Sequence, residues 1–200
     1  MVALFYKYFY DARRDTLIEF FNDDLSRPHE EKGRYLEPGH YFEWIWLLKK
    51  HAKMKQDLSL HESAASRLLD FANRFGWDSL YGGIFDSVAE DGRVMTDTKR
   101  IWPFCEALKA NVLMLERVSN RQILKDRVAD MVQVFKTKYM QERGFWTEWL
   151  HRDLTDAADY MPGTTPYHVY FGITETMDVL NERGKVKSWT SKWAHYTYAF

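Results

Sequence analysis

Two histidines share the same local context in this chain of 200 residues. His40 follows a Pro-Gly pair, and His168 follows a loop that contains Pro162 and Pro166. Each histidine stands where helical periodicity begins, which places an imidazole in the first turn of a helix. Because imidazole titrates near neutral pH, two imidazoles that converge on one cleft supply a general acid and a general base. We therefore take His40 and His168 as catalytic candidates.

Carboxylates and tryptophans accompany these histidines. Glu43 lies three residues after His40, so the two share a helix face, and the carboxylate is expected to orient the imidazole and raise its pKa. A second predicted helix carries Trp102 and Glu106 with similar spacing. Three helix faces thus place titratable groups beside aromatic or small residues, namely His40/Glu43/Trp44/Leu47 with Trp46 adjoining, Trp102/Glu106/Lys109/Leu113, and His168/Phe171/Gly172/Glu175.

The flat apolar surfaces of tryptophans suit the stacking of sugar rings. Together with two histidines and nearby carboxylates, they favour proton transfer at a carbon next to a carbonyl in a polyhydroxylated substrate. A core helix with a hydrogen-bonded histidine would explain one such face. Three faces of this kind in one chain favour a functional site.

Other chemistries find less support. The chain has no Gly-rich phosphate loop, no cysteine cluster, no second histidine for a zinc-protease helix and no Gly-x-Ser-x-Gly elbow. We therefore expect neither a metal nor another cofactor. A glycosidase with two carboxylates remains the competing enzyme hypothesis, but it leaves the histidines without a role. Its candidate acids are Glu43, Glu106, Glu148 and Asp153.

Helix pairs joined by long aromatic loops must position these groups. The unequal spacing of the helix starts argues against a repeat array and favours an all-α, α/α-toroid fold with short β-hairpins in its loops. Long loops gathered at one end would form a pocket. The predicted helices cover about 40–54, 59–75, 98–118, 120–139 and 168–181, with a small β-excursion at 76–97 and long loops at 22–39 and 140–167.

Composition limits the function classes. The formal charge of −1 gives no basic surface for nucleic acid and no polybasic membrane signal, while 16% of the residues are aromatic. Cys105 alone cannot form an internal disulfide, and no secretory or membrane-spanning segment occurs, so we expect a cytoplasmic protein. Residues 2–10 are almost wholly apolar, which predicts a helix that is covered on both sides.

Three ordered motifs resemble the N-acylglucosamine 2-epimerase superfamily, which includes cellobiose 2-epimerases and mannose isomerases. They are Glu-Pro-Gly-His-x-Phe-Glu-Trp-x-Trp-Leu-Leu at 37–48, Lys-x-x-Trp-Pro-x-x-Glu at 99–106 and Pro-Gly-Thr-Thr-Pro-Tyr-His at 162–168. The resemblance implies an (α/α)6 barrel without a metal. It also implies isomerisation or C2 epimerisation of a mannose-like sugar or small oligosaccharide through a cis-enediol.

The resemblance assigns roles to single residues. It implies that His40 and His168 are the acid and base and that Glu43 orients His40. The sugar contacts that it suggests are Trp46, Trp102, Glu106, Trp44, Glu148 and Tyr167.

Length sets this chain apart from the family. Members are about twice as long, so residues 1–181 resemble the C-terminal half of the barrel, and the tail 182–200 has no clear counterpart. Three hypotheses follow: an isomerase completed by a partner N-terminal half or as a homodimer, an inactive half-barrel that binds sugar, and a helical interaction module. Exposed apolar area would favour association in each case.

Overall fold

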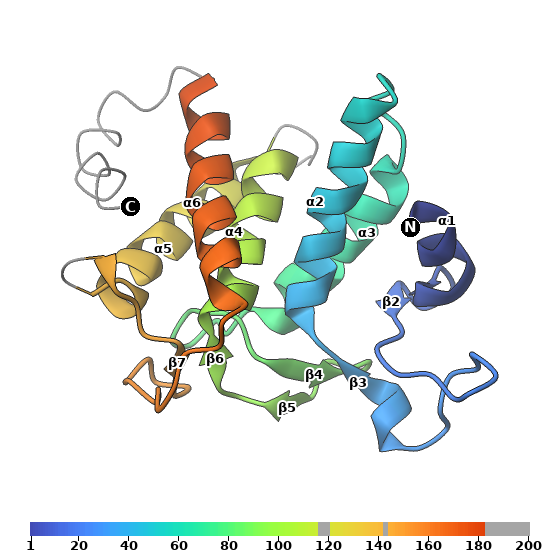
Figure 1. Cartoon of the computed structure of the whole chain (residues 1–200), viewed down its shortest axis with the longest axis horizontal. Helices are drawn as coiled ribbons and strands as arrows, with labels where there is room; N and C mark the ends of the chain where they lie inside the picture. The colour runs from blue at the N-terminus through green and yellow to red at the C-terminus, as the bar shows by residue number, and fades with distance from the viewer. Residues whose placement is uncertain (116–120, 142–143, 183–200) are drawn as a thin grey trace.

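Three long helices form the centre of the structure, which is a computed structural model. They are α2 (Pro38–Met54), α4 (Ile101–Met114) and α6 (Thr165–Glu182). α4 packs against both α2 and α6, and the N-terminal ends of all three lie at the same end of the molecule (Figure 1). The residues that the structure describes are 1–115, 121–141 and 144–182, so most of the tail 182–200 lies outside them.

Two further helices form an outer layer. α3 (Glu62–Phe71) packs against α2, and α5 (Arg121–Val134) packs against α4. The expected helix pairs are therefore confirmed. The second helix starts at Glu62 instead of 59 because His61 adopts a left-handed conformation with φ 69°, which interrupts a helical path. Each outer helix continues into a π-helical turn, over Ala72–Gly76 and Phe135–Tyr139.

Short antiparallel strands gather at the N-terminal ends of the three central helices (Figure 1). The hairpin of β4 and β5 lies in the predicted β-excursion and turns at Asp91-Gly92, where Gly92 has φ +84°. β3 leads directly into α2, and β6 leads directly into α4. The strands are β1 (Tyr10–Asp11), β2 (Thr16–Leu17), β3 (Tyr35–Leu36), β4 (Ser87–Ala89), β5 (Val94–Thr96), β6 (Lys99–Arg100) and β7 (Trp149–Leu150), with a 3-10 turn at Glu31–Arg34.

A buried lysine ties the loops around these strands together. The Lys99 ammonium lies 2.9 Å from Oδ2 of Asp78 and donates to the backbone carbonyls of Gly82 and Arg152 at 2.6 Å each. Lys99 and Asp78 are 0% and 2% exposed. Since a buried charge is tolerated only with such partners, this contact fixes the segment that precedes α4.

The core fills the space between the two helical layers, with Phe42, Ile45 and Phe104 fully buried in it. α6 approaches α4 most closely at Gly172, where an added Cβ would lie 2.7 Å from Cβ of Cys105. The glycine therefore permits a helix contact that sets the position of α6. No helix among the described residues is long and apolar enough to cross a membrane.

The N-terminal stretch differs from the expectation. α1 (Val2–Leu4) is one short turn, and a π-helical turn over Phe5–Phe9 follows it. Phe5 is fully buried, but Leu4 and Tyr6 are 49% and 44% exposed. The stretch is therefore covered on one side only, because α2 and α3 offer it a single surface.

Candidate active site

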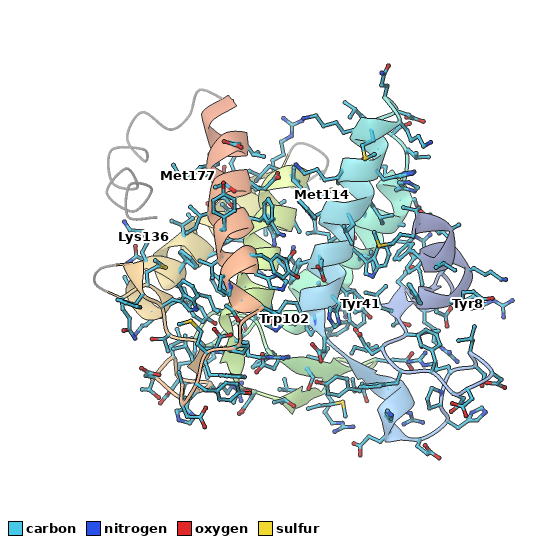
Figure 2. All side chains as sticks on the ribbon, viewed as in Figure 1. Tyr8, Tyr41, Trp102, Met114, Lys136 and Met177 are labelled. Atoms are coloured by element: carbon cyan, nitrogen blue, oxygen red, sulfur yellow. The ribbon has the colours of Figure 1, made fainter. Side chains whose placement is uncertain are left out.

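The two predicted catalytic histidines both lie next to one tryptophan. His40, Trp102 and His168 occupy the first turns of α2, α4 and α6, and Trp102 lies near the N-terminal ends of these helices (Figure 2). The ring centroid of Trp102 is 5.1 Å from that of His40 and 5.2 Å from that of His168. Gly39 makes room for the indole, since a Cβ there would lie 2.6 Å from it.

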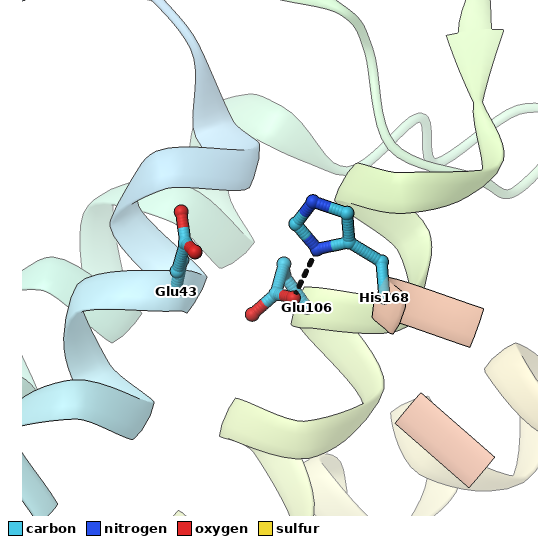
Figure 3. Close-up of side chains that lie close together, drawn as sticks. All are labelled: Glu43, Glu106 and His168. Carbon is cyan, nitrogen blue, oxygen red and sulfur yellow. Dashed lines mark hydrogen bonds and ion pairs between the residues drawn. The ribbon is translucent and has the colours of Figure 1, made fainter. Parts of the chain in front are cut away.

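His168 is bonded to the carboxylate of Glu106, which also pairs with the ammonium of Lys109. Nδ1 of His168 lies 2.6 Å from Oε1 of Glu106, and Nζ of Lys109 lies 2.7 Å from the same oxygen (Figure 3 shows the histidine contact). All three groups are at least nine-tenths buried. Because a carboxylate only accepts hydrogen bonds, Nδ1 carries the proton, and in the neutral ring Nε2 keeps its lone pair for proton transfer.

The hydrogen-bond partner of His40 is Glu19, which the sequence did not suggest. Nδ1 of His40 lies 2.8 Å from Oε2 of Glu19. Burial lowers the pKa of His40, but the hydrogen bond and charge of Glu19, with smaller contributions from Glu37 and Glu43, outweigh it and raise the pKa. The expected role of Glu43 as the orienting partner is therefore wrong, although its charge acts in the expected direction.

Glu43 points instead toward the second histidine. One ligand atom each from Glu43, Glu106 and His168 lies within 4.8 Å of the others, and Figure 3 shows no hydrogen bond from Glu43 to the other two. Burial, followed by the charge of Glu106, raises the pKa of Glu43. This trio has donors that suit a divalent metal, but the Lys109 ammonium already neutralises Glu106. The Glu43 carboxyl therefore lies beside Glu106 and His168 without being bonded to either.

Trp46 and Tyr167 border this group. Nζ of Lys109 lies 4.3 Å from the ring centroid of Trp46, whose buried Nε1 makes no hydrogen bond within the described ranges. The Tyr167 ring lies 3.8 Å from that of His168. Burial and the charges of Glu43 and Glu106 raise the pKa of Tyr167 to about 12. Both predicted contacts therefore lie at the site.

Two other predicted contacts lie elsewhere. Trp44 packs against Phe5 and Phe9 at centroid distances of 4.5 and 6.1 Å, because it sits about 100° around α2 from Glu43. Glu148 is 2% exposed and accepts hydrogen bonds from the Thr165 hydroxyl and the Trp146 indole. It anchors the start of α6, and both of its oxygens are bonded within the fold.

The glycosidase hypothesis, which requires two catalytic carboxylates, loses most of its candidate acids. Asp153 lies in a turn and accepts hydrogen bonds from Thr155, and Glu148 is engaged as described. Glu106 is bound to His168 and Lys109, which leaves Glu43 as the candidate acid of that set that has no hydrogen bond to the residues that the structure describes. The geometry favours acid–base chemistry by imidazoles.

Comparison with known proteins identifies the family of this chain. The profile of the N-acylglucosamine 2-epimerase (GlcNAc 2-epimerase) family matches residues 1–172. This chain belongs to that family. A family relative, the mannose-6-phosphate isomerase of Rhizobium meliloti (strain 1021), is 31% identical over 177 residues, which are 86% of this chain and 45% of the relative.

Solved structures of the family share the fold. A D-mannose isomerase matches with a TM-score of 0.71 and 20% identity over 84% of this chain and 47% of its own. The cellobiose 2-epimerase from Bacillus thermoamylovorans B4167 matches with a TM-score of 0.77 and 14% identity over 98% and 51%. The fold is therefore of the (α/α)6-toroid type. The chain spans about half the length of these relatives.

Proposed function

We propose that this chain forms half of the active site of a sugar isomerase or 2-epimerase that acts on mannose-like sugars. The observation that carries the proposal is the pair of imidazoles against Trp102, each with Nδ1 bonded to its own carboxylate. The family match and the isomerase and epimerase relatives support the reaction class.

In the proposed reaction, one histidine removes the C2 proton of the ring-opened aldose while O1 gains a proton, which gives a cis-enediol. Protonation of C1 with loss of the O2 proton yields the ketose. Protonation of C2 on the opposite face, with loss of the O1 proton, yields the epimer. Each imidazolium formed is stabilised by the carboxylate on its Nδ1, and acid–base catalysis of this kind contributes about 10²–10⁴-fold to rate.

The surrounding groups fit a polyhydroxylated substrate. Trp102 supplies a flat apolar ring next to both histidines, and Trp46 supplies a second aromatic ring beside Lys109. The Glu43 carboxyl, which is not bonded to Glu106 or His168, is placed to accept from a sugar hydroxyl.

We further propose that a second half completes this site, either a partner that resembles the N-terminal half of the family barrel or a second copy. The chain covers 45–51% of its relatives, and α6 exposes a cluster of aromatic side chains that such a half would cover. The exposed fractions are 46% for Tyr167, 56% for Tyr170 and 38% for Phe171. Size-exclusion chromatography with light scattering tests the second copy: a dimer supports it, and a monomer at high concentration excludes it.

The alternative is a catalytically inactive half-barrel that binds sugars or a protein. The short length of the chain relative to the family is the observation that favours it. Deuterium incorporation at C2 of mannose in heavy water, followed by NMR, separates the two functions. With the completing half present, we expect exchange with the unmodified chain, loss of exchange in His40→Ala and His168→Ala, and no change in His29→Ala, an exposed control. Unchanged exchange in the first two variants would reject the proposed mechanism.

A further inference from the structure

We propose that Glu19 is the positioning residue for His40, fixing the tautomer and the orientation of its imidazole. The inference rests on the proposed function for its catalytic meaning. The contact itself is a property of the folded chain: Oε2 of Glu19 lies 2.8 Å from Nδ1 of His40, although 21 residues separate them.

Two contacts besides the bond to His40 hold Glu19 in place. The Leu17 amide donates to the buried Tyr41 hydroxyl at 2.9 Å, which fixes the end of β2 against α2 two residues before Glu19. The second carboxylate oxygen, Oε1, accepts from the Glu37 amide at 3.2 Å. Glu37 is the N-cap residue of α2 and His40 is the third residue of that helix. The Glu19 carboxylate therefore bonds the first turn of α2 at two points.

The location favours a charged carboxylate. The side chain of Glu19 is 11% exposed, whereas that of His40 is 40% exposed. Glu19 lies at the N-terminal end of α2, where unpaired amides and the helix dipole stabilise negative charge. Both the helix and His40 therefore stabilise the negative charge of the Glu19 carboxylate.

The neighbouring carboxylates are not available to His40. Glu37 accepts from the Tyr35 hydroxyl at 3.1 Å and pairs with Arg100 at 3.2 Å. Glu43 points toward Glu106 and His168. Of the residues that the structure describes, Glu19 is therefore the carboxylate that sets the protonation of His40.

The consequence is a fixed tautomer. With Nδ1–H donated to Glu19, the neutral His40 ring keeps its lone pair on Nε2, as His168 does through Glu106. A histidine in water does not favour the ring protonated at Nδ1. Loss of the Glu19 acceptor would therefore let the His40 ring turn or change tautomer. The two bases thus have separate carboxylates on separate parts of the chain.

Histidine NMR of the chain tests this directly, with the His40 resonances assigned by their loss in His40→Ala. In the unmodified chain above the pKa of His40, we expect 15N shifts of a ring protonated at Nδ1. In Glu19→Gln, which keeps an oxygen but removes the charge, we expect the His40 pKa to fall. Glu31→Gln, which removes one charge from an exposed residue elsewhere, should leave that pKa unchanged.

Catalysis provides the second measurement. C2 exchange in Glu19→Gln should fall at least about tenfold with little change in KM, because the loss concerns proton transfer and not sugar binding. Glu19→Asp, which keeps the charge, should retain a raised His40 pKa. A ring protonated at Nε2 in the unmodified chain, or an unchanged pKa in Glu19→Gln, would overturn the proposal. Because NMR needs no turnover, a chain without activity would reject the proposed function while leaving the Glu19 result readable.

Discussion

Nδ1 of His168 and Nζ of Lys109 lie 2.6 and 2.7 Å from the same oxygen of Glu106. The histidine comes from α6, whereas the other two residues lie one turn apart on α4. The buried carboxylate therefore connects two helices by contacting an imidazole from one and an ammonium from the other. The other oxygen, Oε2, is buried and has no hydrogen-bond partner in the described part of the chain.

Removal of the ammonium should destabilise the fold. In Lys109→Met, Glu106 becomes a buried charge without its cation, and breaking a buried pair in this way costs roughly 3–5 kcal/mol. Urea denaturation measures the loss. Lys138→Met, at an exposed position, is the control and should change the free energy of unfolding by less than about 0.5 kcal/mol. Equal effects in the two variants would show that Lys109 has no special role.

Glu43→Gln should stabilise the protein at neutral pH and reduce C2 exchange. Burial and Glu106 raise the pKa of Glu43 in the folded state, so folding disfavours its charged form. That penalty is absent below the unfolded pKa, near 4.3, and appears as pH rises through the folded value. Denaturation at neutral and acidic pH checks the sign: the variant should gain stability only at the higher pH. A Glu43→Gln variant that is less stable than the unmodified chain at neutral pH would contradict this prediction.

His40 should give the opposite pH dependence. Its pKa is raised in the folded state, so its contribution to stability is fully present below the unfolded pKa of about 6.5 and is lost as pH rises through the folded value. Glu19→Gln should therefore be less stable than the unmodified chain near pH 5–6, with a smaller difference at higher pH. The effect should be modest because the side chain of His40 is 40% exposed. A difference that is independent of pH would refute this linkage.

Gly172→Ala tests the contact between α4 and α6. The new Cβ would lie 2.7 Å from Cβ and 3.2 Å from Cα of Cys105, so the helices must separate. Overpacking costs roughly 1–3 kcal/mol, which exceeds the gain in helix propensity of up to about 1 kcal/mol. Thermal denaturation measures the net loss. Gly163→Ala is the matched control, because nothing lies within 4 Å of its Cβ position. Equal melting temperatures for both variants would contradict the tight contact.

Local spacing predicted the parts of the site that depend on one helix at a time. The helix pairs, and the placement of both histidines in first turns, follow from periodicity and from the Pro-containing loops before them. Trp102 and Glu106 were found because they share a face of α4. The predicted β-excursion between the helices is also present, as β4 and β5.

Partners from distant segments could not be predicted in this way. Glu19 reaches His40 from the end of a two-residue strand, and no periodic pattern connects the two. The i,i+3 rule selected Glu43 for His40, but that rule does not say to which neighbouring helix a side chain turns. Likewise, Glu148 fits a sugar contact by type, yet Thr165 and Trp146 occupy its oxygens.

The contact of Trp102 with both imidazoles has a mechanical consequence. Both rings rest on a side chain that belongs to α4, and α4 also carries Glu106. Lys99, just before this helix, is locked by Asp78 and two carbonyls. A displacement of α2 or α6 alone would change one imidazole's distance from the indole, whereas a displacement of α4 would change both. α4 therefore serves as the common reference for the two imidazoles, and the alignment of the proposed proton path depends on how firmly this one helix is anchored.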